Sequence, residues 1–343
     1  MSVNRIVGGM FGLPQAFHAN GAPPPFLRGP CLPLLSARCG LRLLIERLAP
    51  PQTWMPSYLC GVMLDAVDSA RTRLRFYPVD DRLSVASRDW LDGVRAGDLV
   101  LLIAYFGFAS DVGCANEARR RGAVVVEDAC QALLSEPVGA AADYVLYSPR
   151  KFLGVPDGGV LAAVGRAALP DVALERPPAG WWLKAFEAAV LRREFDRHGG
   201  DRRWFELFRE AEADFPIGAL AMSGLSEVLL RNAFDYPAIA RRRRENFVLL
   251  ARELGDIAIF RELPPGVAPL GFPIRVADRD RVRQALFAEG IYPPVHWDLA
   301  GRVPEEFRES HRLSREILTL VCDQRYDAED MRRTTACVRR SLA

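Results

Sequence analysis

The sequence contains very little lysine. Of its 45 Lys and Arg residues only Lys151 and Lys184 are lysines, so arginine carries nearly all of the positive charge. Arginine keeps its proton at working pH and can neither act as a base nor form a Schiff base, whereas a lysine amine can do both. A retained lysine therefore indicates a position where this chemistry is needed, unless it was retained by chance.

The sequence also lacks the patterns of several protein classes. Its seven cysteines are odd in number and include no Cys-x-x-Cys pair, so we expect no disulfide framework, no metal site and a reducing, cytoplasmic location. No signal peptide and no apolar run of the roughly 20 residues that span a bilayer is evident, so no membrane role is expected. With a net charge of +2 and an arginine run at 241–244 that Glu245 follows at once, a nucleic-acid partner is not expected.

The length and the periodicity predict two domains. Half of the 343 residues are apolar, which is enough for a large core and a smaller one. Helical and strand-like segments alternate from about residue 36 to residue 165, which is typical of a parallel sheet wrapped by helices. The predicted helices are 36–48, 115–121, 181–195, 202–213, 238–254, 278–289 and 328–341, and the predicted strands are 73–78, 98–105, 123–126, 144–147, 159–164 and 270–276. We predict a large, mostly parallel α/β domain over residues 1–235 and a smaller α+β domain over residues 236–343.

Two acids, Glu127 and Asp128, follow the predicted strand that ends at Val126. An acid at this place can simply cap a helix. It can also face the pyridinium nitrogen of a cofactor, where it keeps that nitrogen protonated and makes the ring an electron sink. Ligand sites form at the carboxyl ends of parallel strands, so the second interpretation stays open.

Two further segments follow strand ends. Ser148-Pro149-Arg150-Lys151 comes after the strand that ends at Tyr147, and Asp157-Gly158-Gly159 opens the next strand. Paired glycines let the backbone pass close to a neighbour or a ligand. A lone Ser-x-x-Lys also occurs in acyl-serine enzymes, but its combination with an upstream acid and a downstream Gly-Gly is more specific. Lys184 lies in an amphipathic helical segment without this context, and we interpret it as structural.

Together these segments resemble the DegT/StrS-type sugar aminotransferases, which are fold type I pyridoxal-phosphate enzymes. The family has a strand followed by Glu-Asp-x-x-Gln, and VVVEDACQA is similar to it. The family then has an Asp, an aromatic strand with Ser-x-x-Lys, and a Gly-Gly, which are similar to Asp143, YVLYSPRK and DGG in that order. SPRK followed by PDGG resembles a subgroup with Ser-x-Arg-Lys and Pro-Asp-Gly-Gly. The resemblance continues in MPSYLC (55–60), YFG (105–107), GIYPPVHW (290–297), which is similar to a substrate loop of the small domain, and LSREILTL (313–320), which is similar to a late helix.

The resemblance implies pyridoxal 5'-phosphate as the cofactor. Lys151 would form the Schiff base and Asp128 would be the partner of the ring nitrogen, while Gln131 would contact the ring hydroxyl. Ser148 would contact the phosphate, together with the backbone amides of Arg38 and Cys39 in SARCGL, at a helix N-terminus that favours an anion.

The resemblance also implies contacts with the substrate. Tyr105, Arg150 and His296 are the candidates. For Arg150 a contact with the phosphate or a simple ion pair with Asp157 stays open, and for His296 a packed or surface position beside Trp297 stays open.

The sequence departs from the family at two places. Cys60 stands where the family has the aromatic residue that stacks on the cofactor ring, so either Tyr58 or a residue from elsewhere covers the ring, or the stacking is weaker. The segment Pro216–Ser223 lacks the Asn-Tyr-Arg run whose Asn reaches the phosphate of the partner subunit. A homodimer is still expected.

The resemblance implies an aminotransferase that moves nitrogen from an amino-acid donor to a keto-sugar acceptor, which in the family is linked to a nucleotide. Two alternatives stay open, because a fold does not fix a substrate. One is a different pyridoxal-phosphate reaction on the same scaffold, and the other is a regulatory protein that binds the cofactor without catalysis.

Overall fold

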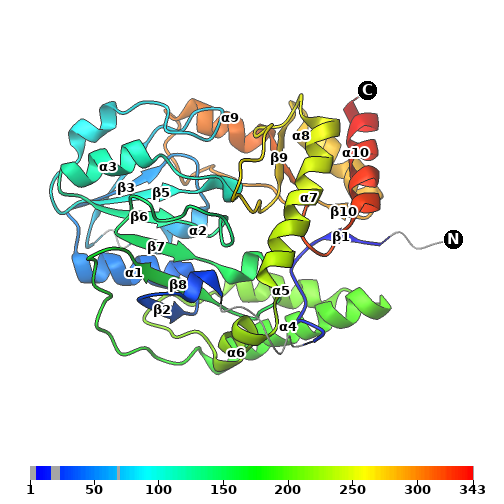
Figure 1. The fold of residues 1–343 in the computed structure, drawn as a ribbon, viewed down its shortest axis with the longest axis horizontal. Coiled ribbons are helices and arrows are strands. Elements are labelled where there is room, and N and C mark those ends of the chain that lie inside the picture. The colour runs from blue at the N-terminus through cyan, green and yellow to red at the C-terminus, as the bar shows by residue number, and fades with distance from the viewer. Residues whose placement is uncertain (1–4, 17–23, 68–69, 343) are drawn as a thin grey trace.

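The computed structural model describes residues 5–16, 24–67 and 70–342, and a seven-stranded sheet forms the centre of its larger part (Figure 1). The spatial order of the strands is β2-β8-β7-β6-β5-β3-β4. They are β2 (Cys31–Leu34), β3 (Gln52–Pro56), β4 (Arg73–Tyr77), β5 (Leu99–Ile103), β6 (Val124–Asp128), β7 (Tyr144–Tyr147) and β8 (Gly159–Ala163). All neighbours from β4 to β7 pair in parallel, and β8 is antiparallel to β7 and β2. The sheet is mostly parallel, as predicted.

The parallel strands bring the carboxyl ends of β5, β6 and β7 to one edge of the sheet. Ile103 at the end of β5 pairs with Asp128 at the end of β6. β7 runs in the same direction and ends at Tyr147, directly before the short 3-10 helix η4 (Pro149–Lys151). The carboxyl ends of neighbouring parallel strands meet at one edge, so Asp128 and Lys151 lie on the same side of the molecule.

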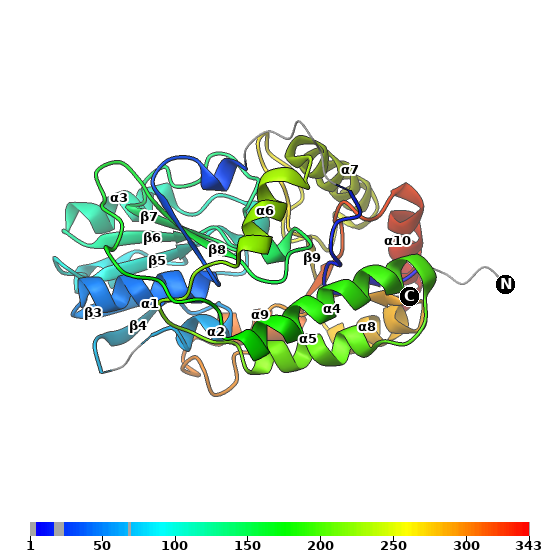
Figure 2. The same cartoon turned by 90° about the horizontal axis from the view of Figure 1, so that it is seen from below.

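Six helices belong to the larger part: α1 (Ala37–Leu48), α2 (Gly61–Leu64), α3 (Val112–Arg120), α4 (Ala179–His198), α5 (Arg203–Ala213) and α6 (Gly224–Asn232). Ser36 begins α1 because its hydroxyl accepts a hydrogen bond from the Cys39 amide at 3.3 Å. Helices α4 and α5 form an antiparallel hairpin that runs away from the sheet (Figure 2). Its far end reaches the smaller part, where Arg202 donates to the Tyr292 hydroxyl.

The smaller part has its own core. It contains α7 (Tyr236–Leu254), α8 (Arg279–Ala288), α10 (Ala328–Leu342) and the strand pair β9 (Phe272–Arg275) and β11 (Ile317–Leu320). The short strand β1 (Val7–Gly8) pairs with β10 (Ile291–Tyr292), and Val7 is buried in this second core. The start of the described chain therefore packs with the C-terminal part. The boundary near residue 235 stays a prediction.

One predicted element is wrong. The segment Leu313–Leu320 is not one helix, because α9 (Arg308–Glu316) ends at Glu316 and the next four residues form β11. Ile317 and Thr319 are β-branched, and antiparallel pairing with β9 outweighs the helical spacing of the apolar residues. Strands β2 and β3 and helix α6 were not predicted, and β6 runs through Asp128 instead of ending at Val126.

Candidate active site

Lys151 faces a cleft between the two parts of the molecule. The cleft has a volume of about 500 Å³, and residues of α5, of the loop after β10 and of β11 line it together with Lys151. The side chain is exposed because the cleft is open, yet protein groups surround its amine closely enough for burial to act on it. Lys184 lies outside the cleft, on α4, where its Nζ is 3.1 Å from Oε2 of Glu210.

Of the two adjacent acids only Asp128 faces the Lys151 side of the sheet. Successive side chains of a strand point to opposite faces. Glu127 accepts hydrogen bonds from Ser110 and from the Gly139 amide. Oδ1 of Asp128 accepts one from the Cys130 amide at 2.9 Å, and its carboxylate acts electrostatically on Lys151.

The surroundings of Lys151 hold its amine protonated. Burial lowers the pKa of Lys151, but nearby acidic groups, Cys130 first and then Asp128, raise this pKa by more. Burial raises the pKa of Cys130 well above its usual value, so its thiol is neutral at pH 7. The carboxylate of Asp128 is therefore the neighbouring group whose charge favours the protonated amine.

One of the two polar atoms of the Gln131 side-chain amide has no hydrogen-bond partner among the described residues. Its Oε1 accepts a hydrogen bond from the Phe106 amide at 2.8 Å. Its Nε2 is buried and has no hydrogen-bond partner among the described residues. An unsatisfied buried donor costs free energy, so the position suits a ligand that presents an acceptor.

The predicted phosphate residues lie at two neighbouring turns. Arg38 and Cys39 are in the first turn of α1, and Ser148 opens η4 on the way to Lys151. The Cys39 amide is already bonded to the Ser36 hydroxyl. A Cβ on Gly159 would lie only 2.1 Å from the Ser36 carbonyl carbon, so this glycine lets β8 pass against the start of α1.

The predicted aromatic residues are packed together. Tyr58 and Tyr105 are both buried, and the Tyr105 hydroxyl donates to the Tyr58 carbonyl. Trp297 packs on both, with ring centroids 5.4 Å from Tyr58 and 6.4 Å from Tyr105. Cys60 is half-buried, and its thiol interacts electrostatically with Lys151. Trp297 is an aromatic residue of this region that the sequence reasoning did not assign.

His296 lines the same cleft as Lys151. Its Nδ1 is 2.8 Å from Oγ1 of Thr319, and its ring meets Phe106 edge-on at a centroid distance of 5.3 Å. Burial, with the charge of Lys151 as a second cause, lowers the pKa of His296 to about 3. The imidazole is therefore neutral at pH 7.

Arg150 does not pair with Asp157, so that alternative is wrong. Its guanidinium pairs with Glu212 of α5. Asp157 is fully buried and accepts hydrogen bonds from the Trp182 indole at 2.8 Å and from the Ser223 amide at 3.0 Å. Glu212 could not be identified from the sequence, because it lies in an ordinary charged helix and contacts Arg150 only in the folded chain.

The cleft carries an excess of positive charge. Its acidic lining residues are Glu212 and Asp323. Its basic lining residues are Arg150, Lys151, Arg202, Arg243, Arg283 and Arg325. Aromatic rings lie among them, such as Trp204 and Phe205 of α5. Such a lining favours an anionic ligand with flat or apolar groups.

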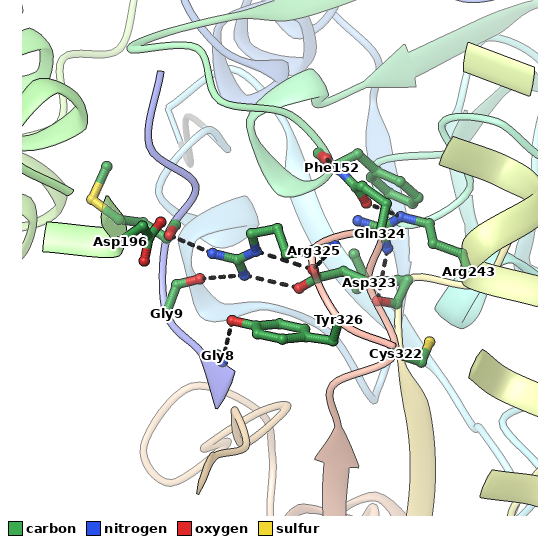
Figure 3. A network of polar contacts seen from close by, with 12 residues as sticks. Gly8, Gly9, Phe152, Asp196, Arg243, Cys322, Asp323, Gln324, Arg325 and Tyr326 are labelled. Atoms are coloured by element: carbon green, nitrogen blue, oxygen red, sulfur yellow. Dashed lines mark hydrogen bonds and ion pairs between the residues drawn. The ribbon is translucent and has the colours of Figure 1, made fainter. Parts of the chain in front are cut away.

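A polar network holds the wall of the cleft next to Lys151 (Figure 3). Arg325 lies between Asp323 and the Gly9 carbonyl, with hydrogen bonds of 2.8 and 3.0 Å. Next to it, Gln324 donates to the Phe152 carbonyl at 2.6 Å and accepts from Arg243 at 2.8 Å. The loop after β11 is thereby tied to the residue that follows Lys151.

The described part of the chain has neither a cluster of metal-ligand residues nor a helix suited to span a membrane. Within residues 5–16, 24–67 and 70–342, no group of three His, Cys, Asp or Glu residues is placed to hold a metal ion. None of the helices described in these ranges is both long and apolar enough to cross a membrane.

The comparison with solved structures shows the fold. Spr1654 from Streptococcus pneumoniae in its PMP form is similar at 16% identity, a TM-score of 0.67, and coverage of 92% of this chain and 88% of that chain. A DegT DnrJ EryC1 StrS aminotransferase from Brucella abortus is similar at 16% identity, a TM-score of 0.62, and coverage of 91% and 85%. The chain has the fold of these aminotransferases. DesI, solved with its TDP-sugar product, shares the aminotransferase fold at 17% identity, a TM-score of 0.63, and coverage of 95% and 86%. No family model and no curated protein sequence matches the chain.

Proposed function

We propose that the protein is a pyridoxal 5'-phosphate-dependent aminotransferase of the DegT/StrS type, which moves an amino group from an amino acid to a keto-sugar linked to a nucleotide. The observation that carries this proposal is the position of Lys151 beside Asp128, in a cleft at the carboxyl edge of the sheet. The neighbour in its PMP form supports the cofactor, and the neighbour solved with a TDP-sugar product supports the class of acceptor.

The residues predicted to bind the cofactor fit it chemically. The amine of Lys151 suits its aldehyde, and the carboxylate of Asp128 suits a protonated ring nitrogen. The free Nε2 of Gln131 suits the ring oxygen, since it is a buried donor without a partner among the described residues. Ser148 and the N-terminal turn of α1 suit the phosphate.

The proposed roles follow from this arrangement. When bound, the cofactor supplies a ring that withdraws electrons from the carbon that loses a proton. Asp128 holds the proton at the ring nitrogen. Lys151 takes the proton from the donor carbon, which requires a neutral amine. Asp128 helps to raise the pKa of Lys151, so a positive charge placed beside Asp128 lowers this pKa toward the range in which the amine can accept a proton.

The lining of the cleft supports an anionic acceptor. Arg202 and Arg283 line it, each against an aromatic ring. Cζ of Arg202 is 4.7 Å from the centre of the Tyr292 ring, and Cζ of Arg283 is 4.6 Å from the centre of the Phe287 ring. Guanidinium groups bind phosphate oxygens, and aromatic rings pack against flat bases. The neutral His296, which lines the cleft with Lys151, is suited to a hydrogen bond with a sugar hydroxyl.

The proposal includes a homodimer in a reducing cytoplasm. All seven cysteines are free, including those beside Lys151. Light scattering of the purified protein at several concentrations tests the dimer, and a monomer at every concentration contradicts it.

The experiment that tests the function is a half-reaction. Protein mixed with pyridoxal 5'-phosphate should absorb at roughly 410 to 430 nm, and glutamate should remove this band. Mass spectrometry then identifies the aminated products from a panel of nucleotide-linked keto-sugars. Absence of the band contradicts the proposal. A band that no amino donor changes favours the regulatory protein, and a dehydrated or cleaved product favours a different reaction on the same scaffold.

A further inference from the structure

Arg38 and Arg150 form a pair of guanidinium groups, and Arg150 directly precedes Lys151. Both lie over the ring of Phe215, with their Cζ atoms 4.0 Å and 4.9 Å from its centre. Both also pair with Glu212. Nη2 of Arg38 is 3.5 Å from its Oε2, and Arg150 contacts its Oε1. One carboxylate and one ring therefore hold two side chains that come from distant segments.

The two arginines carry two positive charges, whereas their shared partner Glu212 supplies one negative charge. Arg38 is 9% exposed, so little water screens it. Like charges that are held together away from water repel strongly. Burial lowers the pKa of Arg38; Glu212 opposes this shift, and Arg150 adds to it. One arginine would be enough for a structural ion pair with Glu212. The second positive charge therefore indicates that another anion binds here.

The two arginines belong to the turns where the phosphate is expected. Arg38 lies in the first turn of α1, where the helix dipole favours an anion. Arg150 shares the turn of η4 with Ser148 and Lys151 and lines the cleft. Guanidinium groups bind phosphate through paired hydrogen bonds, which their planar shape fixes in direction.

We propose that the guanidinium groups of Arg38 and Arg150 bind the phosphate of the cofactor, and that Glu212 and Phe215 position them. This inference rests on the proposed function. Glu212 belongs to α5 and Phe215 follows it, so the α4–α5 hairpin of the same chain supplies both. The chain lacks the Asn-Tyr-Arg run in the segment 216–223. The arginine pair takes the place of that contribution, and one chain completes its own phosphate site.

The test compares pyridoxal 5'-phosphate with pyridoxal, which has no phosphate. Affinities are measured at equilibrium for the wild type, Arg38→Gln, Arg150→Gln and the control Arg283→Gln. Arg283 lines the same cleft but lies against Phe287. Loss of a charged hydrogen bond should weaken binding of pyridoxal 5'-phosphate by about tenfold or more in Arg38→Gln and Arg150→Gln. Binding of pyridoxal should change by less than about twofold, because its affinity does not involve a phosphate contact.

Two outcomes overturn the inference. One is that both ligands weaken equally in the Arg38 and Arg150 variants, which indicates a general loss of structure. The other is that Arg283→Gln weakens pyridoxal 5'-phosphate as much as Arg150→Gln does, which indicates only the overall charge of the cleft.

Inorganic phosphate separates this inference from the proposed function. A wild type that binds neither pyridoxal compound contradicts the function, but the arginine pair can still be judged. Phosphate should then raise the melting temperature of the wild type, and raise it less in Arg38→Gln and Arg150→Gln. An equal rise in all three proteins overturns the pair as a phosphate site.

Discussion

The imidazole Nδ1 of His296 lies 2.8 Å from the hydroxyl oxygen of Thr319. This contact joins the loop after β10 to β11, and both residues line the cleft that contains Lys151. Because burial and the charge of Lys151 lower the pKa of His296 to about 3, the ring meets a ligand as a neutral group with fixed orientation.

The first prediction concerns the titration of His296. In Lys151→Met its pKa should rise, because the positive charge that disfavours the imidazolium is gone. It should stay below the ordinary value of about 6.5, because burial is the larger cause and remains. NMR titration of the imidazole signals measures the change, with the His296 signal assigned by its loss in His296→Gln. Lys184→Met is the control and should leave this pKa unchanged. An unchanged pKa of His296 in Lys151→Met would mean that the charge of Lys151 does not act on this imidazole.

The second prediction uses the two lysines as a matched pair. Lys151→Arg keeps the charge and should fold, but guanidinium neither bonds to the aldehyde nor accepts a proton at neutral pH. The variant should bind pyridoxal 5'-phosphate more weakly, show no visible band and produce no aminated cofactor from glutamate. Lys184→Arg should behave as the wild type, since its ion pairs with Glu210 and Asp214 tolerate arginine. Borohydride should attach the cofactor to Lys151 in the wild type, and attachment at Lys184 ends the assignment.

The third prediction concerns Asp128. Asp128→Asn keeps the shape of the side chain and its hydrogen bond from the Cys130 amide, so the variant should fold and bind the cofactor. It cannot hold the ring nitrogen protonated, and turnover should fall by on the order of a hundredfold or more. Single-turnover rates with glutamate measure this loss. Turnover equal to that of the wild type would mean that Asp128 is a structural acid and takes no part in the reaction.

The sequence allowed the central sheet and the position of Lys151 to be predicted for a physical reason. Buried parallel strands are short apolar runs between turn residues, and β5, β6 and β7 have this pattern. Their parallel order then fixes which strand ends share an edge, so Asp128 and Lys151 could be placed on one side without coordinates. Strand β2 could not be predicted, because Pro33 breaks its pattern and only pairing with β8 makes it a strand.

The residues that hold the site from a distance could not be predicted. Glu212 reaches Arg150 across 62 positions of sequence, and Phe215 reaches Arg38 only because the α4–α5 hairpin folds back along the cleft. Their residue types are ordinary for a solvated helix and its end. Local patterns report on the backbone and on one face of an element, whereas these contacts depend on how the hairpin packs against the sheet.

The last prediction concerns the ion pair of Asp323 and Arg325, which ties the loop after β11 to the Gly9 carbonyl. Burial raises the pKa of Asp323, but the charges of Arg325 and Arg243 and the hydrogen bonds from Arg325 together lower it by more, so its pKa in the folded protein is lowered overall. A carboxyl with a lowered folded pKa contributes stability above its unfolded value of about 3.9, and this contribution is lost as the pH falls through the folded pKa. Asp323→Asn leaves Arg325 without its carboxylate in a buried position, and at pH 7 the free energy of unfolding should fall by about 3 kcal/mol. The difference between the variant and the wild type should shrink below about pH 4, where the wild type begins to lose the same contribution.

The control for this prediction is Asp256→Asn, which removes an ion pair with Arg339 that is about half exposed and should change stability by about 0.5 kcal/mol or less. Urea unfolding of the three proteins between pH 3 and pH 7 measures both effects. A difference for Asp323→Asn that stays constant down to pH 3 would mean that the lost stability comes from packing and not from the carboxylate charge.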